Sequence, residues 1–304
     1  MEHTNYVRAS IRAAIIGSVT LLSGCQFTVL DPKGYVGDEI KELIITALLL
    51  MLIVVIPVIL MTIYFAYKYR ASNQGEEYLP EWSHSNKIEA AVWAVPIVII
   101  AILGTITWKS THALEPSRPL DNKTKAMTIE VVALDWKWLF IYPDQNIATI
   151  NHVVIPKDVP IEFKITSNTV MNSFFIPALG SQIYAMPGMT TKLNLIANHT
   201  GDFKGISASY SGKGFSKMKF TATAVADKQA FSQWVNSVKE SPKNLDSWNR
   251  YCALAQPTED VPVSYYSHVM DGLFKAAIMQ HPGAMMSDSK DMHSFKPCLV
   301  QLNN

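Results

Sequence analysis

Two long apolar segments near the start of the chain limit what it can fold into more than any other feature. The segments 43–67 and 88–108 are almost free of charged side chains. At about 1.5 Å per helical residue, each is long enough to cross a hydrocarbon layer about 30 Å thick. The sequence therefore predicts two transmembrane helices, at 43–67 and 88–109.

The loop between these segments sets their orientation. It spans 68–87 and carries Lys68, Arg70 and Lys87, and cytoplasmic loops are enriched in such residues. Pro57 and Pro96 lie inside the predicted helices, where they are tolerated if neighbouring helices satisfy the freed carbonyl groups. We therefore expect a cytoplasmic loop, a helical partner in the membrane, and a periplasmic chain after Lys109.

The first 24 residues have the pattern of an export signal. Arg8 and Arg12 precede a short apolar run at 13–22, and small residues follow it. The run ends in Leu-Ser-Gly-Cys, which resembles a bacterial lipobox, in which cleavage before the cysteine is coupled to lipid attachment on its sulfur. This pattern predicts a lipidated Cys25 at the start of the mature chain, with a plain cysteine as the alternative.

The region 127–225 has short alternating runs separated by Pro, Gly, Asn and Asp, which is typical of a small all-β sandwich or barrel. In the run 159–166, Ile161 and Phe163 fall on one face while Glu162 and Lys164 fall on the other. The run 217–225 alternates in the same way. About a hundred residues suffice for one independent core.

Helical spacing begins after Ala226. Phe231, Trp234, Val235 and Val238 form one apolar stripe, and Asp227 is placed to cap the first turn. A further helix is predicted at 265–281. The last stretch, 282–304, is polar, and we expect it to be mobile.

Composition and motifs exclude several classes of function. The chain has 304 residues, of which 49% are hydrophobic and 17% charged, with a formal net charge of +1. It has no dense run of Lys and Arg, so nucleic acid is not an expected partner. A phosphate loop, a nucleophile elbow, a zinc-binding helix and a dinucleotide fingerprint are all missing from the sequence. We therefore predict no catalytic residue in this chain.

The most specific pattern is a loop at 205–218 together with two segments upstream. The loop reads Gly-Ile-Ser-Ala-Ser-Tyr-Ser-Gly-Lys-Gly-Phe-Ser-Lys-Met. It follows Asn-Ser-Phe-Phe-Ile-Pro-Ala-Leu-Gly-Ser-Gln at 172–182 and Ala-Met-Pro-Gly at 185–188. This set resembles subunit II of the haem-copper respiratory oxidases, most closely the quinol-oxidising, cytochrome bo-type branch. The helical arm after 226 resembles the arm of quinol-oxidase subunits II.

In the cytochrome c oxidases of that family, two thiolates, two imidazoles and a thioether of this region hold two copper ions. The matching positions here are Ser207 and Ser211 for the thiolates, Ser209 between them, Asn172 and Phe215 for the histidines, and Met218 for the thioether. Neutral hydroxyls are poor copper ligands, a benzyl ring has no lone pair, and one thioether cannot hold the metal. We therefore predict that this chain has no metal site and no redox cofactor.

The resemblance implies a membrane-anchored all-β protein, with a two-helix transmembrane hairpin, a cupredoxin-like Greek-key sandwich and a helical C-terminal arm. The expected organisation is a lipoprotein signal peptide at 1–24, a periplasmic segment at 25–42, transmembrane helices at 43–67 and 88–109 joined by a cytoplasmic loop at 68–87, a linker at 110–126, the sandwich without copper at 127–225, and the arm and tail at 226–304.

Glu89 is the one charged residue inside the second apolar segment. A carboxylate there is costly unless it faces water, a partner or a proton route. The surrounding sequence, Ile-Glu-Ala-Ala-Val-Trp-Ala-Val-Pro at 88–96, resembles the family's second helix, whose acidic residue lies at the cytoplasmic mouth of the K-type proton pathway in subunit I. The resemblance implies that role for Glu89. On the residues alone, an interfacial carboxylate that reaches water is the alternative.

Trp136 and Trp138 belong to an aromatic run at 135–140, which can serve either packing or docking. Copper-bearing relatives have a similar run near the site where cytochrome c delivers electrons, and that role has no acceptor here. We expect both side chains to pack against the sheet or against the membrane-embedded partner.

The remaining cysteines and a Met/His-rich tail raise two further possibilities. With Cys25 lipidated, Cys252 and Cys298 form an even pair in an oxidising compartment, so a disulfide and two free thiols are both open. Six residues near the C-terminus have side chains that bind Cu(I), but their spacing is irregular and favours a flexible tail. They are Met279, His281, Met285, Met286, Met292 and His293.

The resemblance implies a non-redox subunit of a proton-pumping quinol oxidase in the bacterial inner membrane, a multi-pass lipoprotein with its C-terminal domain in the periplasm. Haems and copper are then expected in subunit I, which oxidises ubiquinol and reduces oxygen to water. Expected partners are subunits I, III and IV and membrane lipids. Two alternatives stay open: a membrane lipoprotein acting as a copper-binding or assembly factor, and a cytochrome c oxidase subunit II with an atypical copper site.

Overall fold

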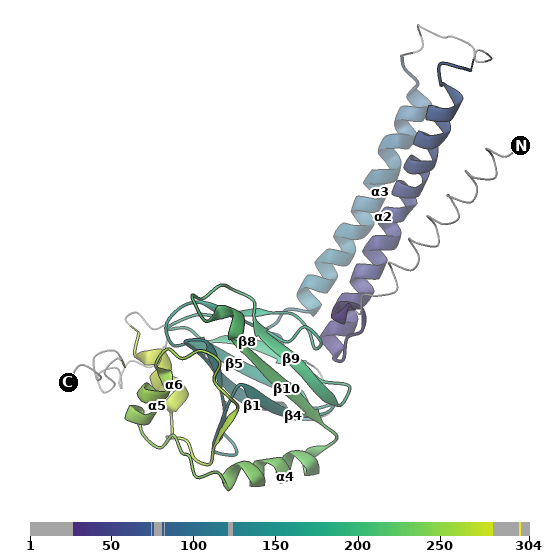
Figure 1. Ribbon diagram of the computed structural model, residues 1–304. Coiled ribbons are helices and arrows are strands. Elements are labelled where there is room, and N and C mark those ends of the chain that lie inside the picture. The colour runs from purple at the N-terminus through teal and green to yellow at the C-terminus, as the bar shows by residue number, and fades with distance from the viewer. Residues whose placement is uncertain are drawn as a thin grey trace, which may run out of the picture.

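The structure, a computed structural model, describes residues 27–73, 75, 81, 83–120, 124–281 and 298. Two long helices form a hairpin that stands away from a β-sandwich, and short helices of the C-terminal arm cover the sandwich (Figure 1). The elements are η1 (Thr28–Leu30), α2 (Tyr35–Lys68), α3 (Asn86–Ala113), β1 (Met127–Leu134), β2 (Lys137–Tyr142), β3 (Ile147–Ile150), β4 (His152–Pro156), β5 (Ile161–Ser167), β6 (Asn172–Phe175), β7 (Ile183–Ala185), β8 (Thr191–Leu195), β9 (Gly201–Ser207), η2 (Phe215–Lys217), β10 (Lys219–Val225), α4 (Lys228–Lys239), α5 (Trp248–Ala255), β11 (Ser264–Tyr266) and α6 (Leu273–Met279).

The hairpin helices α2 and α3 extend beyond the two apolar segments. α2 begins at Tyr35 rather than at residue 43, and α3 continues to Ala113 rather than ending at residue 109. Almost all of their apolar side chains are exposed in the isolated chain. A surface of this size and composition requires lipid or other helices around it, as expected for a membrane hairpin.

The start of α2 is packed into the sandwich, which the pattern at 25–42 did not indicate. Val36 is 4% exposed and belongs to the sandwich core. The backbone N–H of Gly37 donates to the Leu179 carbonyl oxygen at 3.1 Å. Gly34 lies so close to the segment after β8 that an added Cβ would be 2.4 Å from the Ile196 carbonyl oxygen. The hairpin is thus joined to the sandwich through closely packed backbone.

Two sheets form the sandwich. One has the strand order β11-β3-β2-β1-β5-β8 and the other β4-β10-β9-β6-β7. β1 pairs in parallel with β5, and β10 in parallel with β4, whereas the remaining pairs are antiparallel. These crossovers between non-consecutive strands are those of a Greek-key sandwich. The all-β fold that the alternating pattern predicts is confirmed.

The predicted inward faces are also confirmed. Ile161, Phe163 and Ile165 of β5 are fully buried. Ala222 of β10 is also fully buried, and Phe220 is 4% exposed. They meet between the sheets in a core that is rich in aromatic rings. Burial of alternate residues supplies the driving force for these strands, because each side chain of this size contributes about 1.5–3 kcal/mol when removed from water.

The arm covers the outer face of β1, β2 and β3. Side chains of α5 and α6 form a second apolar cluster with the outward residues of these strands. Every residue of β2 and β3 is therefore buried, on whichever face it lies. Asp227 caps α4 as predicted, since its carboxylate accepts a hydrogen bond from the Ala230 N–H at 2.8 Å.

The predicted helix at 265–281 is wrong in its first half. Tyr265 and Tyr266 belong to β11 and pair with Thr149 and Ala148 at the edge of β3. α6 begins only after Gly272, whose φ of 73° lies in the left-handed region. The open sheet edge and the strand preference of tyrosine outweigh the apolar spacing here. α5 was not predicted either.

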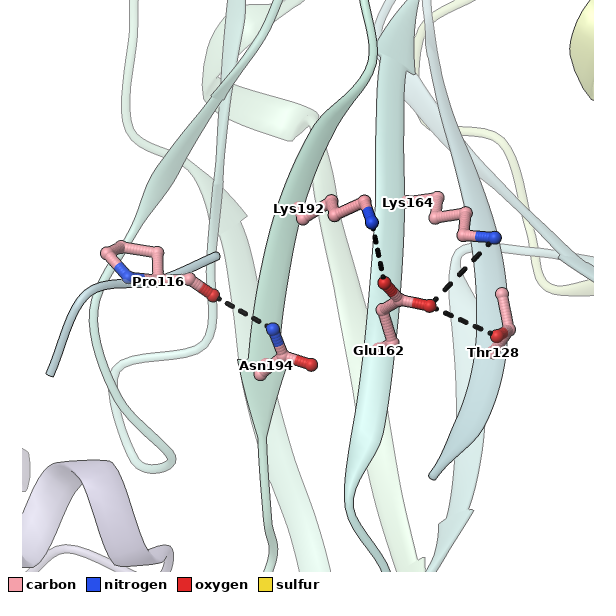
Figure 2. Close-up of polar contacts among 6 residues, drawn as sticks. All are labelled: Pro116, Thr128, Glu162, Lys164, Lys192 and Asn194. Atoms are coloured by element: carbon pink, nitrogen blue, oxygen red, sulfur yellow. Dashed lines mark hydrogen bonds and ion pairs between the residues drawn. The ribbon is translucent and has the colours of Figure 1, made fainter. Parts of the chain in front are cut away.

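The outer face of β1, β5 and β8 carries a polar cluster centred on Glu162 (Figure 2). Its carboxylate lies 3.2 Å from the Lys192 ammonium nitrogen and 3.9 Å from that of Lys164. It also accepts a hydrogen bond from the Thr128 hydroxyl at 3.3 Å. This part of the sheet is where the arm does not reach, which explains why its outward residues are polar.

Glu130 lies on the same face and gives a pH-dependent prediction. Burial raises the pKa of its carboxyl above the ordinary value of 4.5, and the Lys164 ammonium lowers it by less. The folded state therefore disfavours the charged form, and stability falls as the pH rises from 4.5 through the raised pKa. Glu130→Gln should increase the free energy of unfolding at pH 7 and leave it nearly unchanged at pH 4.

Denaturant unfolding of both proteins at the two pH values measures this effect. Glu162→Gln is the matched control, since it removes a paired carboxylate from the neighbouring strand and should not stabilise the fold. A Glu130→Gln protein no more stable than the wild type at pH 7 would contradict the prediction.

Candidate functional site

The six positions assigned from the sequence to a lost copper site lie at one end of the sandwich, around the end of β9 and the start of β6. Asn172 and Ser207 are buried, at 2% and 4% exposed. The Ser207 hydroxyl donates to the Asn172 side-chain oxygen at 3.2 Å and contacts the Ser209 carbonyl at 3.3 Å. The Ser207 N–H donates to the Met218 carbonyl at 3.2 Å. Hydrogen bonds thus join two strand ends that in a metal site would present ligands.

Met218 and Ser211 complete the cluster. Met218 is 1% exposed and belongs to the sandwich core. The Ser211 hydroxyl lies 3.9 Å from its sulfur. Phe215 is only partly buried and packs edge-to-face against Tyr210, with ring centroids 5.7 Å apart. The structure therefore brings Asn172, Ser207, Ser211 and Met218 together, while the Phe215 ring packs with a surface residue.

This set of side chains does not fit a pair of copper ions. Its members are hydroxyls, an amide, a benzyl ring and one thioether, and soft copper ions require thiolate and imidazole ligands. The polar atoms are occupied by hydrogen bonds to one another. Within the described ranges, no group of three or more His, Cys, Asp or Glu side chains is arranged to hold a metal ion.

Packing accounts for both tryptophans of the aromatic run. Trp138 is fully buried and meets the ring of Phe174 edge-on, with centroids 5.3 Å apart. Trp136 covers the loop, and its indole N–H donates to the Ser211 carbonyl at 2.9 Å. An added Cβ on Gly214 would lie 2.4 Å from the Trp136 ring, so this glycine allows the close contact. The sequence predicts that both side chains pack against the sheet or against the membrane-embedded partner; Trp138 packs between the sheets, whereas Trp136 packs on the loop at the edge of the core.

The arm is attached to the loop through ion pairs that the sequence did not reveal. The Lys213 ammonium lies 3.3 Å from the Glu259 carboxylate, and that of Lys217 lies 3.8 Å from Asp260. Isolated surface ion pairs contribute at most about 1 kcal/mol each. These two ion pairs hold the segment after α5 against the loop. Charged residues far apart in the sequence give no signal of such pairing.

Glu89 lies in the first turn of α3. Its side chain is 55% exposed, and one carboxylate oxygen is 3.4 Å from the His84 ring nitrogen Nδ1. The carboxylate is therefore at the helix end that the charge pattern assigns to the cytoplasm, where it is open to solvent or to a partner. The interaction with His84 was not predicted from the sequence.

Cys252 and Cys298 form a disulfide across a separation of 46 residues, which is the pairing that the cysteine count left open. Both residues are buried in the apolar cluster that α5 and α6 form with the sheet, and Cys252 is part of α5. Cys25 and four residues of the Met/His-rich tail (Met285, Met286, Met292 and His293) lie outside the described residues. Of that tail, Met279 ends α6, and burial lowers the pKa of the His281 imidazole.

Two family models match the periplasmic part of the chain. Residues 143–225 match the periplasmic domain of cytochrome c oxidase subunit II. Residues 239–283 match the aromatic-rich motif of the same oxidases. The first match covers most of the sandwich and the six positions above, and the second covers α5, β11 and α6.

Curated relatives cover most of the chain. The cytochrome bo(3) ubiquinol oxidase subunit 2 of Pseudomonas putida is 59% identical over 86% of this chain and 83% of its own length. The ubiquinol oxidase subunit 2 of Acetobacter aceti is 53% identical over 90% of this chain and 89% of its own length. Among solved structures, the periplasmic domain of cytochrome oxidase subunit II of Bradyrhizobium japonicum is 27% identical, with a TM-score of 0.36, over 39% of this chain and 96% of that one. This chain belongs to the family of quinol oxidase subunits II, membrane-anchored proteins with a periplasmic domain.

Proposed function

We propose that this chain is the non-redox subunit II of a proton-pumping ubiquinol oxidase. The observation that carries the proposal is the set of side chains at the end of the sandwich, where the Ser207 hydroxyl bonds to the Asn172 side chain and the Ser211 hydroxyl contacts the Met218 sulfur. A soluble electron donor would need a copper centre at this place to pass its electrons to subunit I. A quinol dissolves in the membrane and can reach a site within subunit I directly, so such a copper centre is dispensable.

In this proposal the haems and copper of the complex lie in subunit I, which carries the quinol and oxygen chemistry. This chain supplies the hairpin that packs against subunit I and the sandwich that covers its periplasmic side. The exposed apolar surface of α2 and α3 supports this role, since such a surface is stable only in contact with lipid or other helices. Subunits III and IV are further proposed partners.

The N-terminal pattern supports a second anchor. Cleavage before Cys25 and lipid attachment to its sulfur would add an acyl chain ten residues before the start of α2 in the sequence. Intact mass measurement of the mature chain tests this proposal. A mass that matches the unmodified polypeptide from residue 25 onwards, or one that retains residues 1–24, would contradict it.

Glu89 is proposed as the entrance of the proton pathway. It is exposed at the cytoplasmic end of α3, and its carboxylate lies 3.4 Å from the His84 ring nitrogen Nδ1. We expect Glu89→Gln to slow steady-state quinol oxidation while haem content stays that of the wild type, because the amide cannot accept and release a proton. Glu42→Gln, near the other end of the hairpin, is the matched control. Unimpaired turnover of the Glu89 variant would rule out this role.

Purification through a tag on this chain, in mild detergent, tests the function itself. The proposal predicts that haem-bearing large subunits accompany the chain and that the preparation oxidises ubiquinol with oxygen. A freely stable chain that copurifies with no haem protein would instead favour an assembly factor. Copper bound with cytochrome c oxidase activity would favour an atypical cytochrome c oxidase subunit.

A further inference from the structure

A cavity of about 320 Å³ lies where the hairpin meets the sandwich. Tyr35 contributes from the start of α2, Ala113 from the end of α3, Arg118 from the linker after α3, and Ile196 from the chain just after β8. Figure 1 shows that this junction is the place where the two long helices reach the sandwich. The lining of this cavity includes neither the cluster of Asn172, Ser207, Ser211 and Met218 nor Glu89.

The linker that forms one wall is held in place. The Pro116 carbonyl accepts hydrogen bonds from the backbone N–H of Asn194 at 3.0 Å and from its side-chain amide at 3.1 Å. Asn194 is 6% exposed, and Figure 2 shows the second of these bonds across the edge of β8. Arg118 follows two residues later, and its guanidinium donates to the His112 carbonyl at 3.1 Å. Its position is thus set by the fold rather than by a loose loop.

Two side chains at this cavity have hydrogen-bond donors that no described residue accepts from. Within the described part of the chain, Arg118 forms no ion pair, and only one of the five N–H donors of its guanidinium is used. The Tyr35 hydroxyl has no hydrogen-bond partner among the described residues, and the side chain is 45% exposed. A guanidinium with free donors, beside a phenol, favours an anionic ligand with several oxygen atoms, such as a phosphate.

The cavity also lies at the level of lipid headgroups. Trp108 is 71% exposed and ends the apolar segment of α3, where an aromatic side chain marks the membrane interface. Ala113 comes five residues later, about 7.5 Å further along the helix at about 1.5 Å per residue. The headgroup layer extends roughly 5–8 Å beyond the hydrocarbon on each side. The exposed apolar sides of α2 and α3 lead directly up to this level.

We propose that this cavity binds the phosphate headgroup of a membrane phospholipid. Arg118 and Tyr35 donate hydrogen bonds to the phosphate oxygens, and the acyl chains lie along the apolar surface of the hairpin. The ligand would fill the cavity between the helices and the sandwich. This inference needs only the membrane anchoring of the chain and does not depend on the proposed role in quinol oxidation.

Lipid titration of the detergent-purified, delipidated full chain tests the site. Native mass spectrometry with added phosphatidylglycerol should show one saturable bound lipid. Arg118→Gln should weaken its binding by about tenfold, because charge-assisted bonds to phosphate are lost, and Tyr35→Phe should weaken it less. Arg250→Gln is the matched control, since Arg250 lies on α5, away from the hairpin, and donates to the Asp246 carboxylate at 3.1 Å.

In the assembled complex, a photoreactive phosphatidylglycerol should label the linker at 113–120. Equal lipid binding by the wild type and Arg118→Gln, or equal weakening by Arg250→Gln, would refute the site. Equally tight binding of glycerol phosphate, which lacks acyl chains, would show that the ligand is a free phosphate and overturn the lipid assignment. A photoreactive group placed at residue 118 that captures only another polypeptide would do the same.

Discussion

Replacing Cys252 and Cys298 together by serine is expected to lower the free energy of unfolding of the periplasmic part by about 2–4 kcal/mol. The disulfide closes a loop of 46 residues, and losing this constraint increases the entropy of the unfolded chain. The bond also joins residue 298 to a buried network, in which the Gln280 amide and the Tyr251 hydroxyl both donate to the Asn168 side-chain oxygen at 2.7 Å. Denaturant midpoints with and without reductant measure the effect.

Ala255→Ser is the matched control for the disulfide. It places a hydroxyl at another buried position of α5, 4% exposed, and leaves the disulfide intact. The intact mass should rise by two hydrogen atoms on reduction of the wild type. A mass that does not change, or a midpoint that reductant does not shift, would show that the two thiols are free.

Gly34→Ala is expected to loosen the junction between hairpin and sandwich at a cost of about 1–3 kcal/mol. The added Cβ would lie 2.4 Å from the Ile196 carbonyl oxygen and 2.9 Å from that of Leu179, and neither backbone atom can swing aside as a side chain can. The φ of Gly34 is −141°, which any residue adopts, so steric contact alone is responsible. Hydrogen exchange at the Gly37 amide, bonded to the Leu179 carbonyl, should become faster.

Gly104→Ala is the matched control for Gly34→Ala, because it adds the same methyl group to the hairpin away from the junction. Gly104 lies in α3, and an added Cβ there meets nothing within 4 Å, so this variant should keep the exchange rates of the wild type. Unchanged protection of Gly37 in the Gly34 variant would mean that the junction tolerates an added methyl group and is less tightly packed than described.

The parts of the fold that the sequence predicts are those set by local periodicity. The alternation at 159–166 places Ile161 and Phe163 in the core, and the apolar run at 88–108 forms the body of α3. The Asp227 cap is equally local. In each case the pattern lies within a few neighbouring residues, and the tertiary packing agrees with it.

The remaining features depend on contacts between distant segments. Gly34 is needed because Ile196 approaches it, and nothing near Gly34 in the sequence indicates that approach. Tyr265 becomes part of a strand because the edge of β3 is open. At the candidate site, the residue types alone lead to the prediction that no copper binds, which the structure does not test, whereas the ion pair between Lys213 and Glu259 required the three-dimensional structure.

The copper content of this chain, purified with its complex and then separated from the other subunits, tests the central claim most directly. The hydroxyls of Ser207 and Ser211, the Asn172 amide and the lone thioether of Met218 should leave it without stoichiometric copper, even after incubation with copper salts, while the intact complex oxidises ubiquinol. Stoichiometric copper on this chain that changes redox state during turnover would contradict the account.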